Sequence, residues 1–304
     1  AAGQAHGAQI ACSAMTTVFD ALRVGNTDGD HDLVTDDMVV LAEAIHDGMA
    51  SGRLRADHYL HLRCEVSSPD CLDAFERLGG RDGVRLASLM DHAPGQRQFA
   101  NLDAYKVYYQ GKLKMTDTQF AAFCDMRVAQ SRDNSDRHRT AIAEIARQRG
   151  IVLASHDDAT DDHVDEAEDN GVRVAEFPTT ETAARASHER GMAVLMGAPN
   201  VVRGGSHSGN VAAHHLAELG LLDILSSDYI PFSLIQATFQ LAETVDGISL
   251  PMAVGMATCT PARAVGLDDR GVIAPGKRAD LARVRQDRGV PIVRTVWRQG
   301  QRVV

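Results

Sequence analysis

The sequence lacks the features of a membrane or secreted protein. No apolar run approaches the roughly 18 residues that a membrane-spanning helix needs. Residues 1–25 contain neither the basic segment nor the apolar core of a signal peptide. The five cysteines are scattered and form no Cys-x-x-Cys pair, which favours a reducing compartment. We therefore expect a cytoplasmic protein that does not contact a membrane.

An excess of basic residues is also absent. The 304 residues include 31 Lys and Arg against 41 Asp and Glu, which gives a net charge of −10. Nucleic acids are bound by basic surfaces, so this balance argues against nucleic acid as a partner. At 44% hydrophobic residues, the chain can bury one large core or two small ones. It is expected to be globular and to act on a small molecule, whether as a monomer or as a homo-oligomer.

Short apolar runs alternate with longer amphipathic segments along the chain. Seven runs are typical of buried strands, namely 14–21, 58–66, 84–92, 151–157, 172–178, 192–198 and 222–228. Helical patterns lie between them, such as 35–52, which begins with Thr-Asp-Asp, and 180–191, which ends on a glycine. The segment 117–150 is too long for one unit, so we expect two helices or a lid there.

This alternation predicts parallel strands with helical crossovers, in either a doubly wound sheet or a (β/α)8 barrel. Seven strand–helix units are present, and a barrel would need one more at the start of the chain. After the last helical pattern, which begins at Pro251, the tail has short β-prone runs split by Gly and Pro. That change of character predicts a small β-subdomain.

The predicted strands end in residue types that bind metals. In a βα barrel the strand ends and the following loops form the active face. One acidic strand end is usually just a solvated loop, but here acids and histidines occur at many ends. Mixed sets of histidine and carboxylate suit zinc, manganese or a similar divalent ion. We predict four ligands from separate strand ends: Glu65, His92, His156 and Asp228.

The strand 58–66 supports this prediction. His61, Arg63 and Glu65 alternate with apolar residues, so the three side chains share one face of the strand. An unpaired buried charge is costly, so that face needs a cavity filled with water or an ion. The alternative is an edge strand with one face in solvent.

Two loops carry donors suited to anions. The segment 197–210 is rich in glycine and lies between a strand and a helix, and the segment 91–101 has a similar composition. Backbone N–H groups of such turns bind phosphate, and arginine adds paired donors. Each loop alone could be merely flexible, but two on one face indicate a substrate with more than one phosphate. The predicted substrate contacts are Arg63, Arg97, Asn200, Arg203, Ser206 and His207.

Several of these segments together resemble one known family. They read HLRCE, SLMDHAPGQRQFAN, ASHDDAT, AEFPTT, LMGAPNVVRGGSHSGNVAA, LLDILSSDYIP and RGVIAPGKRADL. They closely resemble the PhnM family of the bacterial carbon–phosphorus lyase pathway, within the metal-dependent amidohydrolase superfamily. The resemblance extends over nearly the whole chain, and its longest motifs are highly specific.

The resemblance implies a (β/α)8 barrel with a small β-sandwich. We accordingly expect residues 1–265 to form the barrel, with its first strand missing from this chain, and residues 266–304 to form part of the sandwich. The implied reaction is hydrolysis of α-D-ribose 1-methylphosphonate 5-triphosphate to the 5-phosphate and pyrophosphate. One or two divalent ions and a phosphorylated ribose substrate are expected with it.

The resemblance also implies roles for three strand-end residues. Glu65 corresponds to a bridging carboxylate and His156 to a histidine ligand. Asp228 corresponds to the last-strand aspartate, which orients the attacking water and accepts its proton. The chain departs from the family pattern because it shows no first strand with His-x-Asp, and because a glutamate replaces the sixth-strand histidine. Candidates for the second metal position are His92, His207 and Glu176.

His156 is followed by two aspartates. We expect one of Asp157 and Asp158 to line the site and the other to cap the helix that begins shortly afterwards.

Two other functions remain open at this point. The first is hydrolysis of a C–N bond, as in a deaminase or deacetylase, against which the loops rich in Arg and Gly count. The second is a non-catalytic subunit, which an incomplete metal site would favour.

Overall fold

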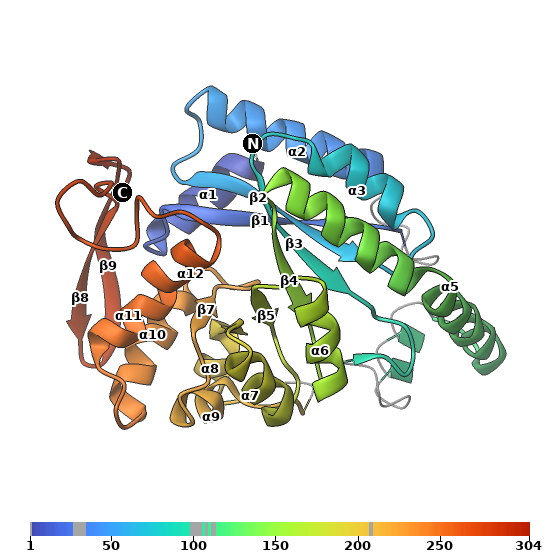
Figure 1. Ribbon diagram of the computed structural model, residues 1–304. Coiled ribbons are helices and arrows are strands. Elements are labelled where there is room, and N and C mark those ends of the chain that lie inside the picture. The colour runs from blue at the N-terminus through green and yellow to red at the C-terminus, as the bar shows by residue number, and fades with distance from the viewer. Residues whose placement is uncertain (1, 27–34, 98–104, 107–108, 111–113, 207–208) are drawn as a thin grey trace. The chain divides into compact units, whose positions relative to one another are not determined.

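The computed structural model describes residues 2–26, 35–97, 105–106, 109–110, 114–206 and 209–304 (Figure 1). The chain forms two compact units. Unit 1 consists of Ala1–Asp20, Ala44–Tyr59 and Ser187–Val304, and unit 2 consists of Ala21–Glu43 and Leu60–Ala186.

Seven strands form one sheet whose order follows the chain from β1 to β7. They are β1 (Thr17–Val24), β2 (Asp57–Glu65), β3 (Val84–Met90), β4 (Val152–His156), β5 (Val174–Glu176), β6 (Ala193–Gly197) and β7 (Ile224–Ser226). The pairs β2–β3, β3–β4, β4–β5 and β6–β7 are parallel. All seven predicted strands are confirmed. A sheet that keeps chain order without reversing is that of a βα barrel rather than a doubly wound fold.

Strand β2 is an interior strand, so the alternative of an edge strand is wrong. It lies between β1 and β3, and its residues are buried or half-buried. Arg63 is in register with Ser88, and Glu65 with Met90. The polar residues of β2 therefore face the interior of the protein, where each one needs a partner.

The helices of unit 2 lie around strands β2 to β5. They are α3 (Cys71–Gly79), α5 (Asp117–Arg149) and α6 (Asp161–Asp169), with parts of α2 (Thr35–Ala50) and α7 (Glu181–Glu189). Helices α3 and α5 pack against each other (Figure 1). The helical patterns 35–52 and 180–191 are thus confirmed as α2 and α7.

The segment 117–150 forms one helix, α5, so the expectation of two helices or a lid is wrong. A capping box begins it: the Thr116 side chain accepts a hydrogen bond from the Gln119 N–H, and the Gln119 side chain accepts one from the Thr116 N–H. Gly150 ends it in the left-handed conformation, at φ 67°. No glycine or proline interrupts the residues between, so nothing in the sequence breaks the helix.

Unit 1 contains the remaining helices and a second sheet. The helices are α1 (Ala2–Cys12), α8 (Ala198–Arg203), α9 (Ala213–Glu218), α10 (Ser233–Thr244), α11 (Leu250–Ala257) and α12 (Cys259–Ala264). The last helical pattern is thus two helices, because Thr258 has non-helical backbone angles between them. The strands β8 (Leu281–Asp287), β9 (Val290–Arg298) and β10 (Gln301–Arg302) form a separate antiparallel sheet in the order β10-β9-β8. The small C-terminal β-subdomain is therefore confirmed, while a boundary between residues 265 and 266 stays a prediction.

One buried carboxylate joins the tail to the start of β2. Asp57 accepts a hydrogen bond from Arg270 at 2.9 Å and lies 3.3 Å from Nε of Arg298. Arg278 forms a third ion pair with the same carboxylate. Removal of Asp57 would leave three guanidinium groups without this partner, so its carboxylate contributes to the attachment of the tail to β2.

Within the described part of the chain, no helix is both long enough and apolar enough to cross a membrane.

The capping box of α5 gives a stability prediction. Thr116→Ala removes the acceptor for the Gln119 N–H and should lower the free energy of unfolding by about 1 kcal/mol, measured by urea denaturation. Thr118→Ala is the matched control, because Thr118 is exposed on the same turn and is not the cap. Equal losses in the two variants would show that the box does not stabilise the helix.

Candidate metal centre

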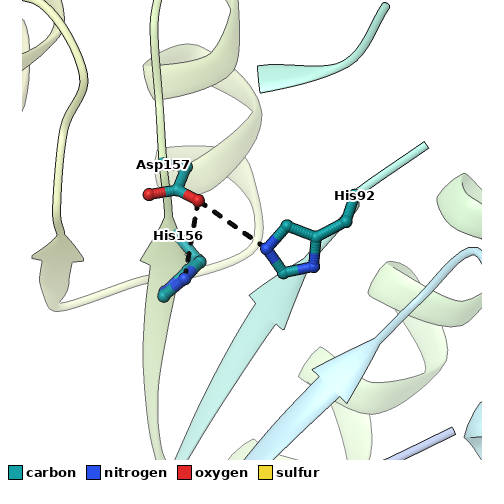
Figure 2. Close-up of side chains that lie close together, drawn as sticks. All are labelled: His92, His156 and Asp157. Atoms are coloured by element: carbon teal, nitrogen blue, oxygen red, sulfur yellow. Dashed lines mark ion pairs between the residues drawn. The ribbon is translucent and has the colours of Figure 1, made fainter. Parts of the chain in front are cut away.

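Three side chains converge at the ends of β3 and β4 in unit 2. His92 follows β3, His156 is the last residue of β4, and Asp157 comes directly after it. Nε2 of His92 lies 3.7 Å from Oδ2 of Asp157, and Nε2 of His156 lies 3.6 Å from the same oxygen (Figure 2). One ligand atom of each residue lies within 4.8 Å of the others. The three form a candidate metal centre of two imidazoles and one carboxylate.

Glu65, at the end of β2, holds His92 through the other ring nitrogen. Nδ1 of His92 lies 2.6 Å from Oε2 of Glu65, and the His92 backbone N–H donates to Oε1 at 3.0 Å. An ionised carboxylate only accepts, so Nδ1 carries the proton in this contact. Nε2 is then the ring nitrogen that faces Asp157. In this arrangement Glu65 orients a ligand rather than joining the three-residue cluster.

Glu176, at the end of β5, does the same for His156. The two residues are in register on neighbouring strands, and Nδ1 of His156 lies 3.1 Å from Oε2 of Glu176. The Ser88 hydroxyl donates to the same oxygen at 2.6 Å, and Nε2 of His61 lies 2.5 Å from that hydroxyl. Burial lowers the pKa of His61 to about 4, so this imidazole is neutral at neutral pH.

The donor set fits a divalent cation. Metal-binding histidines commonly donate their second N–H to a carboxylate, and both His92 and His156 do so here. Nη2 of Arg63 lies 3.2 Å from Nε2 of His156. A guanidinium group only donates, so Nε2 of His156 is unprotonated and accepts from Arg63, and an ion that binds this nitrogen has to displace that contact. In both rings a carboxylate holds Nδ1, so Nε2 is the nitrogen left for an ion.

The charges of the cluster stabilise one another. Burial disfavours a charged His92, but the carboxylates of Glu65 and Asp157 outweigh burial and raise the pKa of His92 to about 9. Burial also disfavours an ionised Glu65, yet His92 and Arg127 hold its pKa well below the usual range. The pKa of Asp157 is lowered against its burial by His156 and then by His92. Both carboxylates are therefore ionised at neutral pH.

The backbone is strained where the chain leaves β4 and β5. Asp157 and Phe177 have positive φ angles of 57° and 54°, a region that residues other than glycine rarely adopt. The Asp157 N–H donates to the Glu176 carbonyl at 2.9 Å, which fixes the turn. Such strain often marks functional positions, because the surrounding contacts must hold it.

Asp158 does not cap the next helix, so that part of the sequence prediction is wrong. Thr160 is the N-cap of α6, and its side chain accepts a hydrogen bond from the His163 N–H. Asp158 is instead buried against Arg97, whose Nη2 also lies 2.5 Å from Oε2 of Glu166. Both terminal nitrogens of the Arg97 guanidinium therefore contact carboxylates.

The other predicted substrate contacts belong to unit 1. The side-chain oxygen of Asn200 accepts a hydrogen bond from the Ala213 N–H at 3.0 Å. Arg203 is exposed, and its Nη1 lies 3.3 Å from the Tyr229 hydroxyl. Ser206 is half-buried, and His207 lies outside the described residues. Their contact with a substrate stays a prediction.

Asp228 follows β7 in unit 1, with a positive φ of 49°. Gly197, at the end of β6, leaves room for its side chain: a Cβ at Gly197 would lie 3.2 Å from Oδ2 of Asp228. A larger residue at position 197 would therefore displace the carboxylate. The role of Asp228 as a ligand or proton acceptor stays a prediction.

The sequence prediction missed three contributors to this site. For Asp157 the sequence left the choice open between it and Asp158. Its position directly after a histidine at a strand end is a signal that could have favoured Asp157. Arg127 and Ser88 were not predicted at all. Each lies within a helix or strand, far along the chain from the residues that it contacts, and has no local pattern to mark it.

The chain is similar in sequence to known proteins. The sequence model of the amidohydrolase family matches residues 51–304. Alpha-D-ribose 1-methylphosphonate 5-triphosphate diphosphatase of Escherichia coli (strain K12) is 50% identical over 300 residues, which cover 98% of this chain and 79% of the relative.

Solved structures show the same fold at low identity. Dihydropyrimidinase from Brevibacillus agri matches with a TM-score of 0.59 at 12% identity, over 98% of this chain and 78% of that protein. Guanine deaminase from C. acetobutylicum matches with a TM-score of 0.59 at 10% identity, over 99% of this chain and 74% of that protein.

The raised pKa of His92 predicts the pH dependence of metal binding. Below its pKa of about 9, metal-free His92 carries a proton on Nε2, which an ion must displace. Affinity for Mn²⁺ should therefore rise by up to about tenfold per pH unit between about pH 7 and 9 and level off above, measured by titration calorimetry. The stability of the metal-free protein changes with pH in the opposite direction. Protonated His92 contributes its full share to the free energy of unfolding below the ordinary pKa of 6.5, and this contribution is lost as pH rises through about 9.

Glu65→Gln provides the control for this titration. It removes the charge that favours the protonated imidazole, so the levelling-off should move to lower pH. An affinity that does not change with pH in the unaltered chain would exclude Nε2 of His92 as a ligand.

Proposed function

The chain belongs to the amidohydrolase family, and we propose that it hydrolyses α-D-ribose 1-methylphosphonate 5-triphosphate to the 5-phosphate and pyrophosphate. The observation that carries the proposal is the 50% identity with the Escherichia coli diphosphatase, spread over 98% of this chain. The match extends over nearly the whole chain, so it spans the strand ends and loops that carry the candidate site as well as the framework.

Within this proposal, His92, His156 and Asp157 hold a divalent ion, such as zinc or manganese. A divalent ion bound there would acidify a water molecule and polarise phosphoryl oxygens. Glu65 and Glu176 keep the two imidazoles in the required tautomer through their Nδ1 atoms. A second ion, and direct ligation by Glu65 or Asp228, belong to the same proposal.

The chain's own residues account for the proton and the leaving group. Asp228 orients the attacking water and takes its proton as the water oxygen bonds to phosphorus. The bond between the first and second phosphates breaks, and pyrophosphate leaves with the bridging oxygen or with the added one, according to which phosphorus is attacked. Arg63, whose guanidinium ends beside His156, is placed to donate to a phosphoryl oxygen near the cluster.

The anion-binding loops supply further donors for a triphosphate. Arg203 is exposed, and it stands with Asn200, Ser206 and His207 in the glycine-rich segment 197–210. Arg97 differs from these donors because its guanidinium already pairs with Asp158 and Glu166. It would have to break these ion pairs to bind a phosphate.

The two alternative functions have less support. Hydrolysis of a C–N bond would draw on the name of the family and on solved structures, which at 10% and 12% identity share the fold and do not indicate the reaction. A non-catalytic subunit would have no need for paired carboxylates behind two histidines. The identity with a named diphosphatase favours the phosphoanhydride reaction.

Product analysis tests the proposed reaction directly. The purified protein is incubated with the ribose 5-triphosphate ester and Mn²⁺ or Zn²⁺, and products are resolved by ³¹P NMR. Pyrophosphate and the 5-phosphate should form in equal amounts, and a sample treated with a chelator should form neither. Release of single phosphates in sequence, or no reaction with any divalent ion, would contradict the proposal.

Replacement of the presumed proton acceptor gives a second prediction. Asp228→Asn should lower kcat by about 10²- to 10⁴-fold, the usual contribution of general base catalysis, while bound metal measured by atomic absorption is largely kept. Asp246→Asn is the control, because Asp246 is exposed in the same unit. Unchanged turnover would remove Asp228 from the mechanism, and loss of the metal would make it primarily a ligand.

A further inference from the structure

Helix α5 has an unusual buried face. Arg127, Ser131, Ser135 and Arg139 are between 1% and 8% exposed, and they recur every four residues along the helix. Such spacing places them in one row, which we name the α5 stripe. A buried helix face is normally apolar, and burying two guanidinium groups costs several kcal/mol unless they are well paired. The stripe therefore depends on specific partners.

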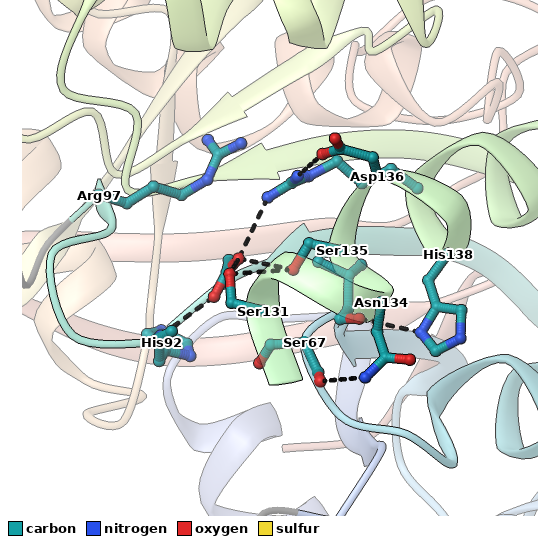
Figure 3. A network of polar contacts seen from close by, with 12 residues as sticks. Ser67, His92, Arg97, Ser131, Asn134, Ser135, Asp136 and His138 are labelled. Atoms are coloured by element: carbon teal, nitrogen blue, oxygen red, sulfur yellow. Dashed lines mark hydrogen bonds and ion pairs between the residues drawn. The ribbon is translucent and has the colours of Figure 1, made fainter. Parts of the chain in front are cut away.

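The first partner is Asp91, which is 2% exposed. The hydroxyls of Ser131 and Ser135 both donate to its Oδ2 at 2.7 Å. Its Oδ1 accepts a hydrogen bond from the Ala93 N–H at 3.0 Å. Asp91 and Ala93 flank His92, so the helix holds the backbone on both sides of this histidine. Figure 3 shows Ser131 and Ser135 on the side of α5 that faces the segment carrying His92.

The second partner is Glu65. Nη2 of Arg127 donates to its Oε1 at 3.2 Å and to the Ser67 hydroxyl at 2.9 Å, and that hydroxyl also donates to Oε1 at 2.6 Å. The other oxygen, Oε2, lies 2.6 Å from Nδ1 of His92. The helix thus fixes one oxygen of the carboxylate, and the carboxylate fixes the ring.

Arg139 completes the stripe. Its Nη2 lies 3.7 Å from Oδ2 of Asp91, and its Nη1 lies 2.9 Å from Oε1 of Glu166. The other oxygen of Glu166 pairs with Arg97. The segment from Asp91 to Arg97 is therefore connected to α5 at both of its ends.

From these contacts we propose that α5 is the positioning element of the metal centre, fixing His92 through Asp91 and Glu65. The helix holds the backbone before and after His92 and the orientation of its ring, so Nε2 is presented toward Asp157 before any ion arrives. Its 33 residues are capped at both ends, which makes α5 a firm support. The inference rests on the metal-binding part of the proposed function and assigns its residues no contact with substrate.

The test removes two hydroxyls that bond to the Asp91 carboxylate and to each other. The double variant Ser131→Ala/Ser135→Ala should bind Zn²⁺ about 10- to 100-fold more weakly, the usual effect of losing such outer contacts, measured by competition with a chromophoric chelator. Thr140→Ala is the matched control, because Thr140 is exposed on the same helix and its hydroxyl bonds only to the Asp136 carbonyl. Its Zn²⁺ affinity should equal that of the unaltered chain.

The melting temperature of each metal-free variant separates positioning from stability. A role in stability alone would lower the melting temperature of the double variant and leave the Zn²⁺ affinity of the folded protein unchanged, and that result would overturn the inference. If the double variant does not fold, the single variant Ser135→Ala keeps one donor to Asp91 and should still weaken Zn²⁺ binding. Unchanged affinity there would equally overturn it.

The outcome for the unaltered chain keeps this inference distinct from the proposed function. If the unaltered chain binds Zn²⁺ and the serine variants bind it equally well, the positioning role fails and the proposed function stands. If the unaltered chain takes up no Zn²⁺, both fail.

Discussion

The contact between Glu65 and His92 is the interaction on which the rest of the site depends. A buried carboxylate can only accept, so it fixes the proton on Nδ1 of His92 and leaves Nε2 for the cluster. The same carboxylate connects three elements, because Glu65 ends β2, His92 follows β3, and Arg127 belongs to α5. Without it, the imidazole would keep neither its tautomer nor its orientation toward Asp157.

The surroundings of that contact show how a protein keeps many charges buried. Arginines pair with carboxylates behind the cluster, as Arg127 does with Glu65 and Arg97 with Asp158. Each pair loses solvation on burial, and the ion pair and its hydrogen bonds offset part of that loss. Such a network adds little net stability, but it permits few alternative arrangements. It suits a site in which ligands must be in place before the ion and the substrate bind.

The fold agrees with the family that the sequence match shows. A sheet whose strands keep chain order brings the ends of β2 to β5 to one edge, where two histidines, at the ends of β3 and β4, lie between the carboxylates of Glu65 and Glu176. This is where a βα barrel carries its chemistry. The family match and the identity with a named diphosphatase come from the sequence as a whole. Together they make hydrolysis of a triphosphate the function that best explains both the cluster and the glycine-rich loops.

The sequence by itself determined the strands and the chemical character of their ends. Parallel strands buried on both faces appear as continuous apolar runs, and a charged residue that ends such a run stands out. The sequence could not decide that Glu65 supports His92, that Asp157 rather than Asp158 joins the cluster, or that Arg97 is held by carboxylates. Nor did local pattern show that α5 has a polar face that is buried. Those outcomes depend on which residues meet across the fold, and a hydrogen bond between distant positions leaves no local signal in the chain; only the tertiary structure decided them.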